Sequence, residues 1–367
     1  MRGAPIPYLV AFLFLLWVFS SCSSVDHFSE YTGVNLLEGK SLADWVPDYN
    51  EASTPAPANP EGGVYMLYES AGSTAGYGGG EAYRLRTKNL FPDGDFESGS
   101  IHSGWQPGGG ASAPSLSGTD SISGNWALEY DLTSTSHYIS FPLSNLTDEF
   151  QGDVPYSFRF DVKYTSGNKL IFDINTLSSE DKTNILNLQQ PSEDTTIFSY
   201  PEDFPLSARI HEVYGQTSLY FLLNTVITTE ADPQKGLIDN IRFLRSDLEY
   251  RIRLVLPRDD PDDPSRLPLP SGSYRFSFYV KQDPDAGSNN VFPASRISFG
   301  IDNAAHSVDA STIGSDWTQV EHTFTNIQID PDSSIELWIS ATDSTEDFYR
   351  DCGSILISSP SLEFLPE

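Results

Sequence analysis

Apolar and polar residues alternate along several short segments of the chain, and this alternation predicts β-strands with one buried face. The segment 156–163 reads Tyr-Ser-Phe-Arg-Phe-Asp-Val-Lys, and the segment 274–281 reads Tyr-Arg-Phe-Ser-Phe-Tyr-Val-Lys. No stretch carries a sustained apolar stripe with the 3.6-residue period of a helix. Short strands separated by turn residues therefore predict an all-β protein built from jelly-roll sandwiches.

Four strand-like segments recur in the same order in two regions of the chain. The segments 156–163, 170–175, 218–223 and 237–243 match 274–281, 297–302, 334–339 and 356–362. This repetition predicts two tandem sandwiches of one plan, over residues 88–247 and 248–367, with the second beginning at a strand over 250–256. Chance similarity between β-strand sequences is the alternative explanation.

The N-terminus predicts export from the cytoplasm. Arg2 precedes an apolar run over 8–19, which is shorter than the ~20 residues of a membrane-spanning helix. The run ends in Phe-Ser-Ser-Cys at 19–22, which resembles the signal of a bacterial lipoprotein in its looser, spirochaete form. The resemblance implies that residues 1–21 are removed and that Cys22 carries the lipid. An ordinary secretory signal cleaved near Ser20 is the alternative.

Residues 22–87 are expected to form a lipid-anchored linker. Its segment 53–60 is rich in proline and reads as a stiff spacer. Strand candidates at 64–68 and 81–87 predict a small hairpin attached to the first sandwich, and the glycine-rich stretch 72–80 between them predicts a flexible loop. The chain has two cysteines, so acylation of Cys22 would leave Cys352 without a disulfide partner.

The net charge of −30, from 51 acidic against 21 basic residues, excludes nucleic acid as a partner, because such a surface repels phosphate backbones. The aromatic content of 13% is sufficient for packed cores, so wholesale disorder is not expected. Acidic side chains can also serve as Ca²⁺ ligands.

Sequence motifs in the first sandwich indicate a family. The segment 89–99 reads Asn-Leu-Phe-Pro-Asp-Gly-Asp-Phe-Glu-Ser-Gly, Gly104-Trp105 follows, 124–130 reads Gly-Asn-Trp-Ala-Leu-Glu-Tyr, and 237–243 reads Leu-Ile-Asp-Asn-Ile-Arg-Phe. Over residues 88–246 this order is similar to the CenC-like carbohydrate-binding modules of families 4 and 9, which are galactose-binding-like jelly rolls. The second unit lacks an opening motif after residue 248.

The resemblance implies a structural calcium ion between the first and last strands of the first sandwich. Glu97 and Asp239 match its side-chain ligands, and backbone carbonyls around Asp95 would complete the shell. Ser358 takes the position of Asp239 in the second unit. Exposed carboxylates without a metal are the alternative.

Three aromatic residues are out of phase with the buried positions of their strands, so they are expected to point outward. These residues are Trp338, Tyr279 and, in the first unit, Tyr220. Aromatic rings stack on sugar faces, which makes the three a candidate ligand platform, whereas cover by a loop or a neighbouring domain would be structural. Trp105 and Trp126 are expected in the core.

No catalytic constellation stands out, because the six histidines lack metal-ligand spacing and no nucleophile elbow or phosphate loop is present. The sequence therefore predicts a non-enzymatic, lipid-anchored envelope protein that binds carbohydrate. An outer-membrane or cell-surface position is expected before an inner-membrane one. The alternatives are an adhesion protein that contacts other proteins and a glycoside-acting hydrolase with an unrecognised site.

Overall fold

The computed structural model describes residues 32–51, 66–134, 136–146, 156–166, 170–176, 186–189, 196–199, 219–225, 234–245, 248–256, 269–286, 292–329, 334–341 and 353–365. Its strands are β1 (Val46–Glu51), β2 (Met66–Gly72), β3 (Ala82–Thr87), β4 (Gln106–Gly108), β5 (Ser115–Ser117), β6 (Ala127–Leu132), β7 (Tyr138–Pro142), β8 (Tyr156–Ser166), β9 (Leu170–Thr176), β10 (Leu186–Gln189), β11 (Thr196–Ser199), β12 (Leu219–Thr225), β13 (Gln234–Arg245), β14 (Leu248–Leu256), β15 (Gly272–Gln282), β16 (Arg296–Ile301), β17 (Ala304–Asp309), β18 (Thr318–Ile327), β19 (Ile335–Ser340) and β20 (Ser354–Leu365). Single 3-10 turns lie at η3 (Leu42–Asp44), η4 (Tyr77–Gly79), η5 (Leu143–Asn145) and η6 (Ala310–Thr312). The prediction of an all-β protein is confirmed. Within these described ranges, no helix is long and apolar enough to cross a membrane.

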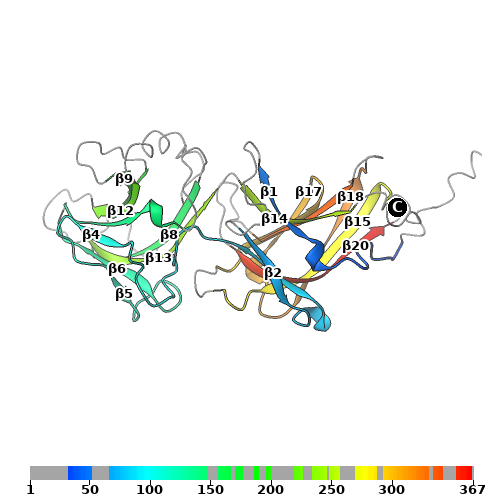
Figure 1. Ribbon diagram of the computed structural model, residues 1–367, viewed down its shortest axis with the longest axis horizontal. Coiled ribbons are helices and arrows are strands. Elements are labelled where there is room, and N and C mark those ends of the chain that lie inside the picture. Colours follow the sequence, from blue (N-terminus) through cyan, green and yellow to red (C-terminus); the bar gives the residue numbers. More distant parts are fainter. Residues whose placement is uncertain are drawn as a thin grey trace, which may run out of the picture.

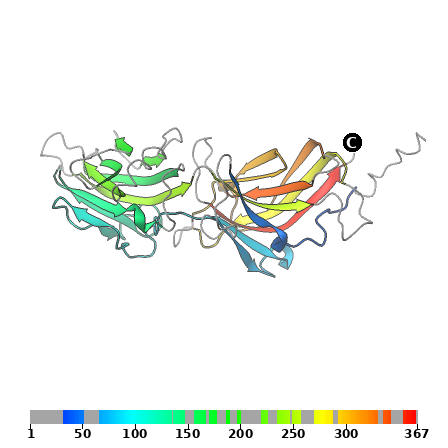
Figure 2. The same ribbon diagram turned by 45° about the horizontal axis from the view of Figure 1, so that its top comes forward.

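The strands form four antiparallel five-stranded sheets, which pair into two sandwiches (Figures 1 and 2). The first sandwich has the sheets β10-β9-β12-β7-β4 and β11-β8-β13-β6-β5. The second has the sheets β17-β16-β19-β14-β1 and β18-β15-β20-β3-β2. Position by position, the ten strands β4–β13 correspond in chain order to β1–β3 followed by β14–β20. The repeated plan predicted from the sequence is thus confirmed, since its four matched pairs are β8/β15, β9/β16, β12/β19 and β13/β20.

The first sandwich is inserted into the second, between β3 and β14. Figure 1 shows β1 and β2 in the same lobe as β14, β15 and β20, although the whole first sandwich lies between them in the sequence. β1 pairs with β14, and β3 pairs with β20, each in antiparallel register. The prediction that residues 22–87 are a linker is therefore wrong for 32–51 and 66–87.

The hairpin predicted at 64–68 and 81–87 exists as β2 and β3, but its placement beside the first sandwich was wrong. Leu85 and Ile355 face each other across the β3–β20 pair, and both are buried. Burying this apolar face against the second sandwich is what determines the hairpin's position. The strand expected at 250–256 is β14, which is the fourth strand of its sandwich and not the first.

Aromatic side chains connect the two sheets of each core. Phe276 of β15 meets Phe299 of β16 edge to face, with ring centroids 5.7 Å apart. Phe221 of β12 meets Phe243 of β13 in the same way at 5.5 Å. Such edge-to-face contacts suit the charge distribution of aromatic rings and add to the energy of apolar burial.

Each sandwich has a β-bulge at the same place in its last strand. The pairing of β13 with β8 shifts register between Asp239 and Arg242, and that of β20 with β15 shifts between Ser358 and Ser361. Asn240 and Ser359 occupy the bulges with φ of 51° and 49°. Bulges redirect side chains and end regular pairing, so this point of each sandwich is a natural place for a site.

Candidate functional site at the bulge of the last strand

An asparagine ties the opening segment of each sandwich to its last strand. Asn89 Oδ1 accepts hydrogen bonds from the backbone N–H groups of Phe91 and Phe243, at 3.1 and 2.8 Å. Asn35 Oδ1 accepts from Leu37 N and Leu362 N, at 3.0 and 3.1 Å. In both sandwiches the asparagine accepts from the N–H two residues after it and from an N–H at the same position of the last strand, so the two opening segments are equivalent.

The second sandwich therefore has an opening motif, contrary to the prediction from the sequence. It reads Asn-Leu-Leu-Glu-Gly over 35–39 and lies before β1, outside the range 248–367 predicted for this sandwich. Trp45 and Trp105 follow the two motifs, and both are buried. Trp126 is partly buried against the core, so core packing of Trp105 and Trp126 is confirmed.

In the first sandwich the bulge holds a cluster of acidic and polar side chains. Asp239 is fully buried, and it accepts hydrogen bonds from Ser123 N at 3.0 Å, Ser123 Oγ at 3.2 Å and Asn240 N at 2.8 Å. Asp161 lies opposite Asp239 in the β8–β13 pairing and accepts from Asn240 Nδ2 at 2.6 Å. Burial is the main cause that raises the pKa of Asp239 to about 7; the bonds from Ser123 and Asn240 lower it, and the charge of Asp161 raises it further.

Glu97 holds the loop that leads into β6. Its Oε1 accepts from Asn125 N at 2.7 Å and Trp126 N at 3.0 Å, and its Oε2 accepts from Asn125 Nδ2 at 2.8 Å. Asp95 is buried, and its Oδ1 accepts from Glu97 N at 3.3 Å. Within the described residues, no three His, Cys, Asp or Glu side chains are gathered as a metal site. Calcium at Glu97, Asp239 and the carbonyls near Asp95 stays a prediction.

In the second sandwich the same bulge carries two stacked tyrosines. Tyr279 lies opposite Ser358 in the β15–β20 pairing, as Asp161 lies opposite Asp239. The ring of Tyr77 stacks on that of Tyr279 with centroids 3.5 Å apart and planes 7° from parallel. Tyr77 is 45% exposed, so one face of the stack is open to solvent. A hydrogen bond with Tyr77 is the main cause that raises the pKa of Tyr279. We call Tyr77 and Tyr279 the tyrosine shelf.

The glycine-rich segment 72–80 positions the shelf. Ser358 Oγ accepts from Tyr77 N at 3.0 Å and donates to the Glu81 carbonyl at 2.7 Å, so it holds both ends of the turn. A Cβ atom on Gly76 would come within 2.2 Å of the Glu81 carbonyl oxygen, so glycine is required there for close approach. The loop that the sequence predicts to be flexible is tied to β20 at this point.

A tryptophan and a lysine lie beside the shelf on the same face of the sheet. Val280 pairs with Thr318, so Lys281 on β15 and Trp317, one residue before β18, take the adjoining outward positions. Lys281 Nζ lies 4.8 Å from the Trp317 ring centroid, a cation–π contact. Trp317 is diagonal to Tyr279 across the strand pair, a placement at which large side chains reach one another.

Trp338 lies on the opposite sheet of the same sandwich. It points outward, because its neighbours Leu337 and Ile339 are buried. Its indole N–H donates to the Asp302 carbonyl at 3.0 Å, and its ring lies over Gly300, 2.6 Å from where a Cβ would be. An aromatic ring that covers a glycine of the neighbouring strand protects the sheet, so the indole has a structural role here.

Tyr220 belongs to the first sandwich, where it is half-buried on β12 beside the buried Phe221. The three aromatics predicted as one platform thus point outward from three different sheets: Tyr279 from the β15 sheet, Trp338 from the β19 sheet and Tyr220 from the β12 sheet. Among the residues that the structure describes, a stacked and exposed ring lies beside Tyr279 and not beside Trp338 or Tyr220.

Tyr77 and Trp317 were missed as site residues from the sequence. Tyr77 lies in a loop, where strand periodicity gives no orientation. Trp317 stands one residue before β18, and its outward position follows from extending the alternation of that strand by one residue. Cys22, Cys352, the signal over 1–21 and the spacer over 53–60 lie outside the described residues.

No family model matches the chain, and no curated protein matches it. Among solved structures, it is similar to the N-terminal tandem CBM22 modules of Xyn10C from Paenibacillus barcinonensis, with 11% identity over 75% of this chain and 97% of that one and a TM-score of 0.32. The family 11 carbohydrate-binding module of Lic26A-Cel5E from Clostridium thermocellum has 14% identity over 44% and 96%, with a TM-score of 0.27. TmCBM61, solved with β-1,4-galactotriose, has 10% identity over 75% and 98%, with a TM-score of 0.18.

Proposed function

We propose that the protein is a non-catalytic glycan-binding protein, and that the tyrosine shelf on the second sandwich contacts the sugar. The observation that carries this proposal is the stack of Tyr77 on Tyr279, which presents an exposed aromatic face on the outside of a sheet. Large exposed aromatic surfaces mark interaction sites, because leaving them in water is unfavourable.

The surroundings of the shelf suit a sugar better than a purely apolar partner. A pyranose ring has an apolar C–H face that packs on an aromatic ring and a rim of hydroxyls that needs hydrogen-bonding groups. The tyrosine hydroxyls and Lys281 supply such groups beside the rings. The chain's charge of −30 favours a neutral glycan over an acidic one.

We further propose that Cys22 is acylated and holds the protein at the outer membrane or cell surface. The support is the Phe-Ser-Ser-Cys sequence after a short apolar run. In this position the sandwiches would bind polysaccharide from outside or from the cell's own envelope. Radiolabelled palmitate should be incorporated by the native chain and not by a Cys22→Ala variant; equal labelling of the two would contradict the anchor.

Replacement of Tyr77 by alanine tests the glycan proposal. A glycan array with the purified mature chain identifies a ligand, and titration calorimetry then compares variants. Tyr77→Ala should weaken binding about tenfold, since losing an aromatic stacking contact costs ~1.4 kcal/mol. The turn itself should persist, because Ser358 binds the backbone of residue 77 and not its side chain.

Tyr220→Ala and Trp338→Ala serve as matched controls on other sheets, and both should bind as the native chain does. Loss of binding in Trp338→Ala with no change in Tyr77→Ala would move the site to the opposite sheet. An array without any bound glycan, together with a specific envelope protein captured by the native chain, would replace glycan by protein as the ligand.

A further inference from the structure

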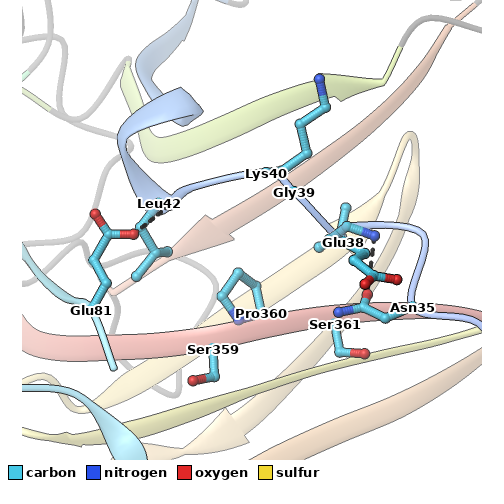
Figure 3. A pocket seen from close by; sticks show the side chains of 10 residues that line it. Asn35, Glu38, Gly39, Lys40, Leu42, Glu81, Ser359, Pro360 and Ser361 are labelled. Atoms are coloured by element: carbon cyan, nitrogen blue, oxygen red, sulfur yellow. Dashed lines mark hydrogen bonds between the residues drawn. The ribbon is translucent and has the colours of Figure 1, made fainter. Parts of the chain in front are cut away.

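A polar pocket of about 450 Å³ lies between the segment 35–42 and the bulge of β20 (Figure 3). Figure 3 shows Pro360 between the Glu81 end and the Asn35 end of this pocket, facing the opening segment. The lining includes the side chains of Glu38, Lys40, Glu81, Ser359, Pro360 and Ser361.

The pocket opens where the first sandwich is closed. In the first sandwich, Ile241 N donates to the Gly94 carbonyl at 2.8 Å, and a Cβ on Gly94 would meet the Ile241 carbonyl oxygen at 2.0 Å. Pro360 lies two residues after Ser358, as Ile241 lies two residues after Asp239, so Pro360 in β20 is equivalent to Ile241 in β13. Proline has no N–H, and the hydrogen bond that closes the first sandwich cannot form in the second.

Hydrogen bonds hold both ends of the pocket in place. At one end, Glu81 Oε2 accepts from Ser41 Oγ at 2.9 Å and from Leu42 N at 3.0 Å. At the other end, Asn35 ties the opening segment to Leu362. The pocket is therefore preformed, which lowers the entropic cost of binding.

The lining has the chemistry of a site for an uncharged polyhydroxyl molecule. Two carboxylates accept hydrogen bonds, and the hydroxyls of Ser359 and Ser361 can donate or accept them. Lys40 lies at the rim, and Figure 3 shows its ammonium pointing away from Pro360. Leu42 and Pro360 add apolar surface. A sugar hydroxyl both donates and accepts, so it matches this mixture, whereas an anion would meet Glu38 and Glu81.

We propose that this pocket is a second binding site, which takes a single neutral sugar unit. The inference deepens the proposed function, on which it rests only in taking a glycan as the ligand. Ser358 connects the two sites, since it binds the backbone of both Tyr77 and Glu81. The shelf would stack on one unit of a glycan, and the pocket would enclose another unit or a chain end.

The test uses the mature full-length chain and the methyl glycosides of glucose, galactose and mannose, with binding measured by titration calorimetry. Pro360→Ile supplies β20 with the N–H that Ile241 has and should close the pocket. Binding of the best methyl glycoside should weaken at least tenfold. A Glu38→Gln, Lys40→Met double variant should weaken it as well, and both residues are exposed, so the fold is not at risk. Tyr77→Ala should keep this binding within about twofold.

The outcomes separate the two proposals. If none of the three methyl glycosides binds, or if Pro360→Ile and the double variant both bind as the native chain does, the pocket proposal is wrong. If Tyr77→Ala leaves polysaccharide binding intact while Pro360→Ile abolishes methyl glycoside binding, the shelf is wrong and the pocket stands. Circular dichroism of each variant shows that the fold is retained.

Discussion

At the scale of residues, the bulge of the last strand carries two different chemistries on one backbone arrangement. Asp239 and Asp161 face each other in the first sandwich, and Ser358 and Tyr279 do so in the second. In both sandwiches a buried side chain at this position accepts a hydrogen bond from a backbone N–H of the loop before the third strand. Asp239 accepts from Ser123 N, and Ser358 accepts from Tyr77 N. A change of side chains, with no change of strand pairing, turns an acidic cluster into an aromatic shelf.

The acidic cluster predicts a pH dependence of stability. The pKa of Asp239 is raised from 3.8 to about 7 in the folded chain, so the folded state keeps a proton that the unfolded state has lost between those pH values. Stability should therefore fall as pH rises from about 4 to 7 and level off above it. Calorimetric unfolding of the native chain and of Asp239→Asn at several pH values measures this. The unfolding transition of the first sandwich should depend less on pH in the variant than in the native chain.

The same residue gives a sharp test of calcium. A bound cation would favour the ionised form of Asp239 and would offset the loss of stability above pH 7. At pH 8, Ca²⁺ should raise the midpoint of the transition that Asp239→Asn alters, and a chelator should lower it. A midpoint that is the same in Ca²⁺ and in chelator would mean that this sandwich does not bind calcium.

At the scale of elements, the glycine-rich turn between β2 and β3 is a support for the shelf. Gly76→Ala would place a Cβ against a backbone oxygen, which cannot move away as a flexible side chain would. We expect a loss of about 1–3 kcal/mol of stability in urea unfolding, together with weaker glycan binding. Gly314→Ala is the control, because a Cβ there meets nothing within 4 Å. Equal stability of the two variants would mean that the turn is not tied to β20.

At the scale of the whole molecule, the second sandwich is split and the first is an insertion. In the first sandwich, β6 reaches β7 through the short loop 133–137, whereas the equivalent β3 and β14 are separated by the whole inserted sandwich. β20 pairs with β3 at its start and bridges to Thr32 near its end. The chain thus enters the second sandwich at the end of β20 that lies away from the insertion, so an N-terminal anchor would leave the first sandwich distal.

Excision of the insertion tests this architecture. Replacing residues 88–247 by a loop with the sequence of 133–137 should leave a folded second sandwich that keeps the shelf and the pocket. Removing residues 32–51 from the same chain should unfold it, because the edge strand β1 and the buried Trp45 are lost, and a buried Trp alone is worth about 3–5 kcal/mol. Cooperative unfolding measured by circular dichroism separates the outcomes. A chain that folds without 32–51 would contradict the split sandwich.

Much of the strand content could be predicted from the sequence. Burial alternates along β15 as predicted, with Phe276 and Phe278 inward and Tyr279 outward. The four matched segments fall on equivalent strands, because alternation with period two is a local property that the chain itself displays. The site could be predicted only in part: Tyr279 was found from its phase, whereas Tyr77 was not, because a loop has no phase.

The local pattern of residues was enough to establish that this protein is all-β, that four of its strands recur in the same order, and which side of β14, β15 and β19 is buried. The choice of partner strands became visible only in the folded chain. Hydrogen bonds between strands join residues far apart in the sequence, and one buried face fits several neighbours equally well in pattern. For that reason the sequence predicts a linker where the folded chain has β1–β3, which pair with strands of the second sandwich. The contact of Tyr77 with Tyr279 was hidden in the same way, because the whole first sandwich lies between the two residues in the chain.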